Sequence, residues 1–163
     1  MTFKKTAIYP GTFDPITLGH LDIIKRASAL FDKLVIAVAA SPSKEPLFLA
    51  KERVNMVKET INDMKNIEVK SFNGLLVEFA KKEQAIVIVR GLRAVSDFEY
   101  EFQMSFINRT LYPGIETIFL PATGNAHFIS SSFVKEITKL KGSTENLVPK
   151  TVQNKLIKKL KNE

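Results

Sequence analysis

The sequence predicts a single α/β domain with a parallel five-stranded sheet and helices on both faces, and two patterns lead to this prediction. Short apolar runs typical of strands alternate with longer segments of helical periodicity, which is the order found in α/β domains. The runs 34–40 and 85–89 are apolar throughout. Continuous apolarity indicates strands that are covered on both faces.

Five strands are expected, and the first segments between them have the spacing of amphipathic helices. The strands are predicted at residues 6–9, 34–40, 67–71, 85–89 and 117–120. Segments 18–31 and 53–64 place apolar or small residues three and four positions apart. Both are predicted to be helices that connect parallel strands.

Three further helices are expected in the second half of the chain. One is predicted over residues 96–111, because the Ser96 hydroxyl can cap it while Glu99 completes a capping box. The other two are predicted over residues 131–141 and from Pro149 onward, since proline favours the first turn of a helix.

Length and composition fit one folded domain over residues 1–163, without repeats or a linker. With 45% hydrophobic and 25% charged residues, the chain has enough apolar mass to bury a core. It contains no cysteine, which excludes disulfides, thiolate catalysis and cysteine-ligated metal sites. The net charge of +7 favours anionic partners, phosphates first, although the lysines of segment 150–161 supply much of the excess.

Neither a targeting segment nor a membrane span is apparent in the sequence. The residues after Met1 lead into only a short apolar run before Pro10, without the apolar core of a signal peptide. No stretch approaches the roughly 18 apolar residues that a membrane span requires. We therefore expect a cytoplasmic protein without a membrane partner.

Candidate site residues are densest directly after the first predicted strand. They occupy the segment Tyr9-Pro10-Gly11-Thr12-Phe13-Asp14-Pro15-Ile16-Thr17-Leu18-Gly19-His20. In an open parallel sheet, ligands bind beyond the carboxyl ends of the strands, where this segment lies. Gly11 lets the backbone approach a ligand, and the following helix presents unpaired N–H groups to an anion. His20, in the first turn, adds an imidazole that can act in catalysis.

This segment resembles the signature of the nucleotidyltransferases that carry the (His/Thr)-x-Gly-His motif, which Thr17 to His20 match. Three more segments narrow the resemblance to the bacterial phosphopantetheine adenylyltransferase family, in that family's order and spacing. They are Ala39-Ala40-Ser41-Pro42-Ser43-Lys44, Arg90-Gly91-Leu92-Arg93-Ala94-Val95-Ser96-Asp97-Phe98-Glu99-Tyr100-Glu101 and Phe128-Ile129-Ser130-Ser131-Ser132. The resemblance covers nearly the whole chain and implies a Rossmann-like fold.

The resemblance also implies a reaction. The family transfers the adenylyl group of ATP to 4'-phosphopantetheine with Mg²⁺, giving dephospho-coenzyme A and pyrophosphate in the penultimate step of coenzyme A synthesis. The residues present agree with this chemistry, because the acceptor phosphate is itself the nucleophile and no enzyme nucleophile is needed. The protein must supply alignment and positive charge, which His20, Lys44, Arg90 and Arg93 can provide.

Site roles follow from the resemblance residue by residue. Thr12 would contact both substrates, and His20 would stabilise the charge that develops on the transferred phosphate. Lys44, Leu76 and Arg90 would join Thr12 in binding phosphopantetheine. The ATP site would comprise Thr12, Phe13, His20, Gly91, Leu92, Arg93, Glu101, Ala126, His127, Phe128, Ile129, Ser130, Ser131 and Ser132.

Several of these residues have a structural alternative. Arg90 ends an apolar strand, where an unpartnered arginine is costly, so we expect a bound anion there. Glu101 is equally an acidic residue early in a helix, and Leu76 is equally a core residue. His127 is better explained as a histidine satisfied within the fold. At Ala126 the family commonly has a bulky aromatic residue, so any stacking contribution from that position is lost.

Three other functions compete with this interpretation. Another member of the superfamily, such as a cytidylyltransferase or a nicotinate mononucleotide adenylyltransferase, would share the first motif but not the Arg-Gly-Leu-Arg segment. A nucleic-acid-binding module is supported only by the basic charge, and the lysine-rich tail has no aromatic residue on which bases could stack. A catalytically silent nucleotide sensor would not need the full set of site residues. We therefore expect no nucleic-acid partner.

The resemblance further implies a homohexamer and feedback by coenzyme A. A direct Mg²⁺ ligand is not identified, since phosphates and water can hold this ion.

Overall fold

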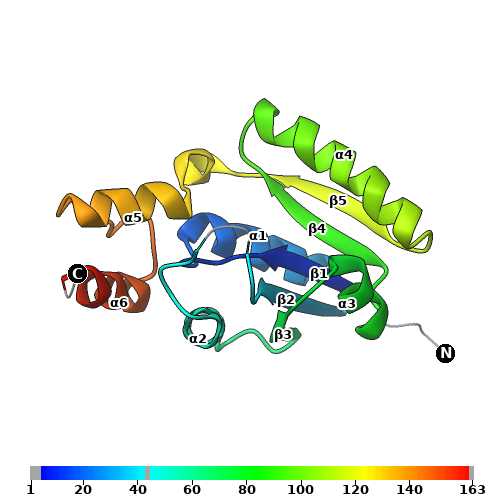
Figure 1. Cartoon of the computed structure of the whole chain (residues 1–163), viewed down its shortest axis with the longest axis horizontal. Coiled ribbons are helices and arrows are strands. Elements are labelled where there is room, and N and C mark those ends of the chain that lie inside the picture. The colour runs from blue at the N-terminus through cyan, green and yellow to red at the C-terminus, as the bar shows by residue number, and fades with distance from the viewer. Residues whose placement is uncertain (1–4, 43–44, 162–163) are drawn as a thin grey trace.

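The computed structural model describes residues 5–42 and 45–161 and confirms the predicted fold class (Figure 1). Its parallel five-stranded sheet has the order β3-β2-β1-β4-β5. The strands are β1 (Thr6–Gly11), β2 (Lys33–Ala39), β3 (Ile67–Phe72), β4 (Val87–Leu92) and β5 (Glu116–Pro121). All five predicted strands are present, with small shifts at their ends.

Within the described residues, six α-helices and one 3₁₀ helix connect and follow the strands. They are α1 (Leu18–Leu30), α2 (Ala50–Thr60), α3 (Leu76–Lys82), α4 (Val95–Leu111), η1 (Gly124–Phe128), α5 (Ser131–Lys139) and α6 (Lys150–Lys161). α3 and η1 were not predicted from the sequence, because they have only seven and five residues, too few to show a helical repeat. Within the described ranges, no helix is both long and apolar enough to cross a bilayer.

The predicted start of α2 is wrong by nearly one turn. The helix begins at Ala50, whereas the apolar repeat becomes visible only at residue 53. Glu52 explains the earlier start, because its carboxylate accepts a hydrogen bond from the Leu49 N–H at 2.8 Å. That contact satisfies one of the free N–H groups at the helix end.

The predicted capping of α4 is also wrong. Ala94 is the N-cap and makes no side-chain cap bond, so Ser96 already lies inside the first turn. The acidic side chain that acts here is Asp97, which accepts a hydrogen bond from the Arg93 N–H at 3.3 Å. The expected capping box of Ser96 and Glu99 is therefore not formed.

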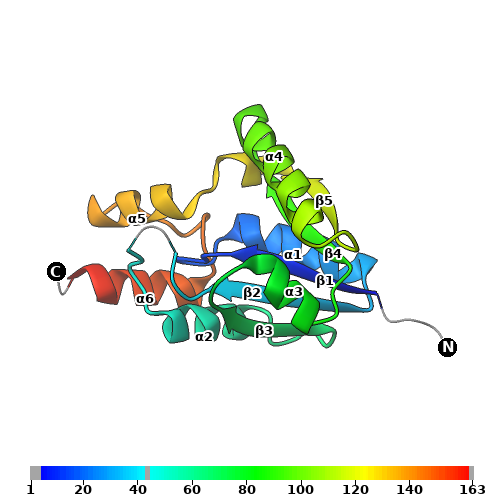
Figure 2. The ribbon, with the colours of Figure 1, turned by 45° about the vertical axis from the view of Figure 1, so that its right-hand side comes forward.

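Both faces of the central strands β1, β2 and the first half of β4 are buried, as their continuous apolar runs predict. Alternate strand residues point to opposite faces. The larger core takes Ala7, Leu34, Ile36 and Val38, and the smaller core takes Ile8, Val35 and Ala37. Side chains of α1, α2, α5 and α6 complete the larger core, and α3 covers the smaller one (Figure 2).

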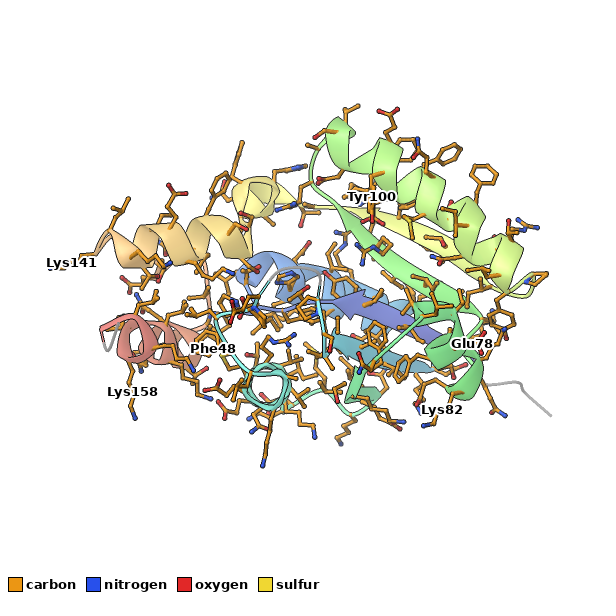
Figure 3. The ribbon with its side chains drawn as sticks, viewed as in Figure 1. Phe48, Glu78, Lys82, Tyr100, Lys141 and Lys158 are labelled. Atoms are coloured by element: carbon orange, nitrogen blue, oxygen red, sulfur yellow. The ribbon has the colours of Figure 1, made fainter. Side chains whose placement is uncertain are left out.

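The C-terminal helix α6 lies beside α2. Two ion pairs join the helices, Lys155–Glu59 at 2.6 Å and Lys159–Glu52 at 3.3 Å. The Lys159 ammonium also lies 5.6 Å from the centroid of the buried Phe48 ring, labelled in Figure 3. Part of the lysine-rich tail is thus engaged in helix packing.

β1 and β4 share the fewest paired residues of any two neighbouring strands in the sheet. β1 pairs with β2 from Thr6 to Gly11, but it pairs with β4 only through Ala7↔Val87 and Ile8↔Ile88. Beyond Ile8 the two strands separate. The order in which the strands follow one another along the chain reverses between β1 and β4. In open parallel sheets, ligands bind outside the carboxyl ends of the strands at such a switch point.

Candidate active site

A cleft of about 880 Å³ lies at the carboxyl ends of β1 and β4. This volume is within the range of small-molecule sites. The loops after β1 and β4, the helix η1 and the first turn of α5 line it. The lining includes these residues predicted from the sequence: Thr12, Phe13, His20, Arg90, Gly91, Leu92, Arg93, Glu101, Ala126, His127, Phe128, Ile129, Ser130, Ser131 and Ser132.

One predicted site residue does not line the cleft, and another falls outside the described residues. Lys44 falls outside the described residues, so its role stays a prediction. Leu76 is the first residue of α3 and packs against the smaller core, and it does not line the cleft. Its position fits the core alternative, and a contact with substrate stays a prediction.

His20 is held by the cap that begins α1. Thr17 Oγ1 accepts a hydrogen bond from the His20 N–H at 3.3 Å, and the Thr17 N–H donates to His20 Nδ1 at 3.0 Å. Because Nδ1 accepts from a backbone N–H, the single proton of the neutral ring is on Nε2. The helix cap therefore also fixes the tautomer of the imidazole.

The environment of His20 keeps the ring neutral. Burial, followed by the charges of Arg93 and Arg90, lowers the pKa of His20 to about 4. The ring packs against Phe13, with the two centroids 5.0 Å apart. At neutral pH, His20 is thus an uncharged hydrogen-bond donor through Nε2.

The turn that carries Thr12 is shaped by a buried Phe13. Phe13 has a φ of 50°, a left-handed conformation that is rare for a bulky residue. Its ring fills the space beside Gly11, where a Cβ would lie 3.0 Å from the Phe13 ring. Glycine is needed at position 11 because of this close approach, not only because a ligand lies near.

Arg90 connects β1 and β4 beyond their last paired residues. Its Nη1 donates to the Pro10 carbonyl at 2.9 Å, and its Nε and Nη2 donate to the two carboxylate oxygens of Glu101. Burial opposes the charge of Arg90, but the hydrogen bonds that Arg90 donates to Glu101, together with the charge of that carboxylate, outweigh burial and raise the pKa of Arg90. Glu101 thus supplies an anion to Arg90 from within the chain, and the contact of Arg90 with a bound anion stays a prediction.

Glu101 itself lies in the second turn of α4, with a mostly buried side chain. It is too far along the helix to act on the N-terminal dipole, which is effective only in the first turn. The dipole explanation for Glu101 is therefore wrong, and its pairing with Arg90 explains its position.

The second arginine of the cleft is held from two sides. Asp97 forms an ion pair with the Arg93 side chain at 3.4 Å, and His127 Nδ1 lies 3.0 Å from the Arg93 carbonyl oxygen. The latter contact connects η1 to the loop after β4. His127 is thus satisfied within the fold, as its structural alternative predicts, and it also lines the cleft.

The first turn of α5 closes the cleft on the opposite side. Ser130 caps the helix by accepting a hydrogen bond from the Phe133 N–H at 3.1 Å. The Ser131 hydroxyl donates to the Pro15 carbonyl at 2.8 Å and so connects α5 to the loop after β1. This leaves the start of α5, with its unpaired N–H groups, at the edge of the cleft.

Two charged residues to which the sequence assigned no role organise these loops. Asp14 is 3% exposed, accepts from the N–H groups of Leu47 and Phe48, and pairs with Lys135 at 2.9 Å. Arg53 is fully buried on α2. Its signal in the sequence was a charged residue at a position that the helical repeat assigns to the core.

Comparison with known proteins places this site in a class of enzyme. Residues 8–137 match the family model described as cytidylyltransferase-like. The fold is similar to that of a Vibrio parahaemolyticus protein described as a nicotinate-nucleotide adenylyltransferase, with a TM-score of 0.73, 20% identity, and coverage of 99% of this chain and 97% of that one. It is also similar to Plasmodium falciparum nicotinic acid mononucleotide adenylyltransferase, with a TM-score of 0.70, 16% identity, and coverage of 98% and 96%. The chain is a nucleotidyltransferase of this class.

More similar relatives identify the family within that class. The phosphopantetheine adenylyltransferase of Caldanaerobacter subterraneus subsp. tengcongensis is 52% identical over 157 residues, which are 96% of this chain and 98% of the relative. That of Wolbachia pipientis wMel is 59% identical over 154 residues, which are 94% of this chain and 92% of the relative. The chain belongs to the phosphopantetheine adenylyltransferase family, and the family predicted from the sequence is confirmed.

Proposed function

We propose that this cleft transfers the adenylyl group of ATP to 4'-phosphopantetheine, with release of pyrophosphate and formation of dephospho-coenzyme A. The observation that supports this most is the convergence of Thr12, His20, Arg90 and Arg93 on one cleft of a chain from this family. An oxygen of the acceptor phosphate attacks the α-phosphorus of ATP, and the bond from that phosphorus to the pyrophosphate oxygen breaks. The protein contributes alignment and charge stabilisation rather than a nucleophile.

In this proposal His20 donates a hydrogen bond from Nε2 to the transferred phosphate. The donor is preorganised, because the Thr17 N–H holds Nδ1 and thereby the orientation of the ring. With its pKa lowered to about 4, His20 keeps the same proton through the reaction at neutral pH. The imidazole therefore stabilises charge without acting as a general acid or base.

Arg90 is proposed to bind the phosphate of phosphopantetheine. A guanidinium has five N–H groups, and three of those of Arg90 are taken by Pro10 and Glu101. The two that remain, one on each Nη atom, are available to a phosphate. Glu101 would then keep the guanidinium in place, in addition to the ATP contact that the resemblance implies.

The ATP phosphates are proposed to lie between the loop after β4 and the start of α5. Arg93 offers positive charge on one side, and the hydroxyls of Ser130 and Ser132 with the N–H groups at the start of α5 offer donors on the other. Ala126 lies in η1 on the wall of this part of the cleft. The missing aromatic ring at this position affects ATP affinity rather than the chemical step.

Mg²⁺ is proposed to enter with ATP. Across residues 5–42 and 45–161, no three acidic or histidine side chains lie together as a metal site. Three of the cleft carboxylates, Asp14, Asp97 and Glu101, each face a basic side chain, and the fourth in the described lining, Glu45, is exposed. Such a donor set fits an ion held mainly by phosphate oxygens and water. When bound, the ion would neutralise charge on the triphosphate.

We also propose the homohexamer, the feedback by coenzyme A and the cytoplasmic location that the family resemblance implies. Support for assembly comes from α4, none of whose residues is buried within the chain. Its exposed apolar side chains are Val95, Phe98, Tyr100, Phe102, Phe106, Ile107 and Leu111, with Tyr100 labelled in Figure 3. Apolar surface of this extent favours contact with another protein surface. Analytical ultracentrifugation tests the proposed hexamer, and a monomer at micromolar concentration would contradict it.

The reaction is tested by pyrophosphate release from ATP and Mg²⁺. 4'-Phosphopantetheine, nicotinate mononucleotide and glycerol 3-phosphate are offered separately, with a His20→Ala variant as control. We expect release with 4'-phosphopantetheine alone, and a loss of about 10²–10³-fold in the variant. Release with another acceptor would overturn the proposed substrate, and ATP binding without any release would favour a nucleotide sensor.

A further inference from the structure

The guanidinium of Arg53 is fully buried and is bonded only to backbone carbonyls among the described residues. Its Nη1 donates to Thr12 at 2.8 Å and to Ala39 at 2.7 Å. Its Nη2 donates to Ala40 at 3.3 Å, and its Nε to Phe48 at 3.0 Å. A planar group with donors in a fixed fork can hold several acceptors at defined positions, which a lysine cannot.

These carbonyls belong to three segments that meet at the carboxyl end of the sheet. Thr12 is the first residue after β1, Ala39 and Ala40 are at the end of β2, and Phe48 precedes α2. The pairing of β1 with β2 ends at Gly11↔Val38. Arg53 therefore connects the segments that follow β1 and β2 just beyond the last residue pair of the two strands.

Asp14 strengthens this arrangement from the other side. It accepts a hydrogen bond from the Phe48 N–H at 2.9 Å, while Arg53 holds the Phe48 carbonyl. The backbone of residue 48 is thus fixed at both polar groups by two buried charged side chains. The anchor to which Arg53 ties Thr12 is rigid as a result.

We propose that Arg53 is a positioning residue for the transfer reaction. By holding the Thr12 carbonyl, it fixes the Thr12 hydroxyl and N–H where they contact the reacting phosphates. The proposal rests on the role of Thr12 in the proposed function. Arg53 itself touches neither substrate nor reacting atoms.

A purely structural role for Arg53 makes a different prediction. Loss of a buried group that only stabilises loops lowers the fraction of folded protein but leaves each folded site fully active. Loss of a positioning residue lowers kcat per folded site, because misplacement by about 1 Å can reduce the rate about 100-fold. The effect must also depend on the Thr12 hydroxyl.

The test is a double-mutant cycle of Arg53→Met and Thr12→Ala, with kcat expressed per ATP-binding site counted by calorimetry. We expect each single variant to lower kcat at least tenfold, and Arg53→Met to have less than a threefold effect once Thr12 is alanine. Arg53→Lys replaces the fork by one ammonium and should fail to restore kcat. If the methionine variant does not fold, the lysine variant takes its place in the cycle.

The matched control is Asn66→Ala at the other end of the sheet. Asn66 Nδ2 also donates to two backbone carbonyls, those of Ser28 and Phe31 at 2.8 and 3.1 Å. This variant should lower the melting temperature and leave kcat per site within twofold of wild type.

The possible failures are distinguishable. Unchanged kcat per site in both Arg53 variants, or equal effects of the Arg53 change in both Thr12 backgrounds, would overturn the inference. An unchanged kcat in Thr12→Ala alone would overturn the role of Thr12 and the inference with it. A wild-type protein that releases no pyrophosphate would overturn the proposed function before any variant is compared.

Discussion

The protonation state of His20 gives the sharpest prediction, and the perturbation that tests it is pH. The Thr17 N–H donates to His20 Nδ1, and burial with the charges of Arg93 and Arg90 lowers the pKa of His20 to about 4. We expect a neutral ring protonated on Nε2 throughout the range from pH 8 to pH 5.5.

The size of the effect follows from the pKa difference. A fall in the pKa from the ordinary value of 6.5 to about 4 means that protonating His20 costs about 3 kcal/mol more free energy in the folded protein than in the unfolded chain. The unfolded chain binds this proton at higher pH than the folded chain does. The contribution is therefore fully present above pH 6.5 and is lost as the pH falls towards 4. Over that window, His20 lowers the free energy of unfolding by up to about 3 kcal/mol.

Nitrogen chemical shifts of the imidazole measure both properties. In the free enzyme, we expect the shifts of an Nε2–H tautomer without titration between pH 8 and 5.5. A His127→Gln variant assigns the signals, since the chain has 2 histidines. In the pH profile of kcat/KM, we expect no change near pH 6.5 that is caused by His20. Any step seen there in the wild-type enzyme should also be present in the His20→Gln variant. A His20 that titrates near 6.5, with activity greatest in the charged form, would refute a neutral donor.

Three further predictions concern stability and binding around the cleft. Glu101→Gln removes the charge that faces Arg90 and should lower the free energy of unfolding in urea by about 1–3 kcal/mol; an unchanged midpoint would contradict the ion pair. Asp14→Asn should cost about 2–3 kcal/mol by thermal denaturation, below the 3–5 kcal/mol of a fully buried pair, because the Lys135 side chain is 27% exposed and still reaches water. A stability equal to wild type would show that the Asp14 contacts are not needed. Leu76→Ala should lower stability by about 2 kcal/mol, at the small end for leucine because the residue is only half-buried; a raised KM for phosphopantetheine in the same variant would support the contact predicted from the sequence.

The sequence was sufficient for the fold class because its strand signals are strong. The apolar runs 34–40 and 85–89, which supply most of β2 and the first half of β4, are typical of strands in a sheet that helices cover on both sides. Helix ends were less predictable, because they depend on side chains that compete for the same role. At α4, Ser96 and Asp97 are neighbouring polar residues, and only the backbone shows that Asp97 turns back to Arg93.

Within the candidate site, the loops were predictable and the buried polar contacts were not. The sequence motifs predicted that His20, Arg90 and the serines at the start of α5 belong to one site, and the structure places them on one cleft. The partner of Arg90 is 11 residues away, and that of Arg53 at Thr12 is 41 residues away, on elements whose relative placement no local pattern contains. Contacts of this kind depend on how the elements pack, which spacing along the chain does not specify.

The short pairing of β1 with β4 has a consequence for the dynamics of the whole sheet. The ladder between β1 and β4 consists of two residue pairs and the Arg90 bridge, fewer contacts than in the other ladders, so the carboxyl ends of these two strands open more readily than the other ladders, while apolar cores shared by both halves keep the sheet together. Ligands bound across the ends of both strands would stabilise the closed arrangement in proportion to their affinity. Amide hydrogen exchange of β1 and β4 would then slow together when both substrate sites are filled, including at Thr6–Ile8 and Val87–Val89, which do not line the cleft.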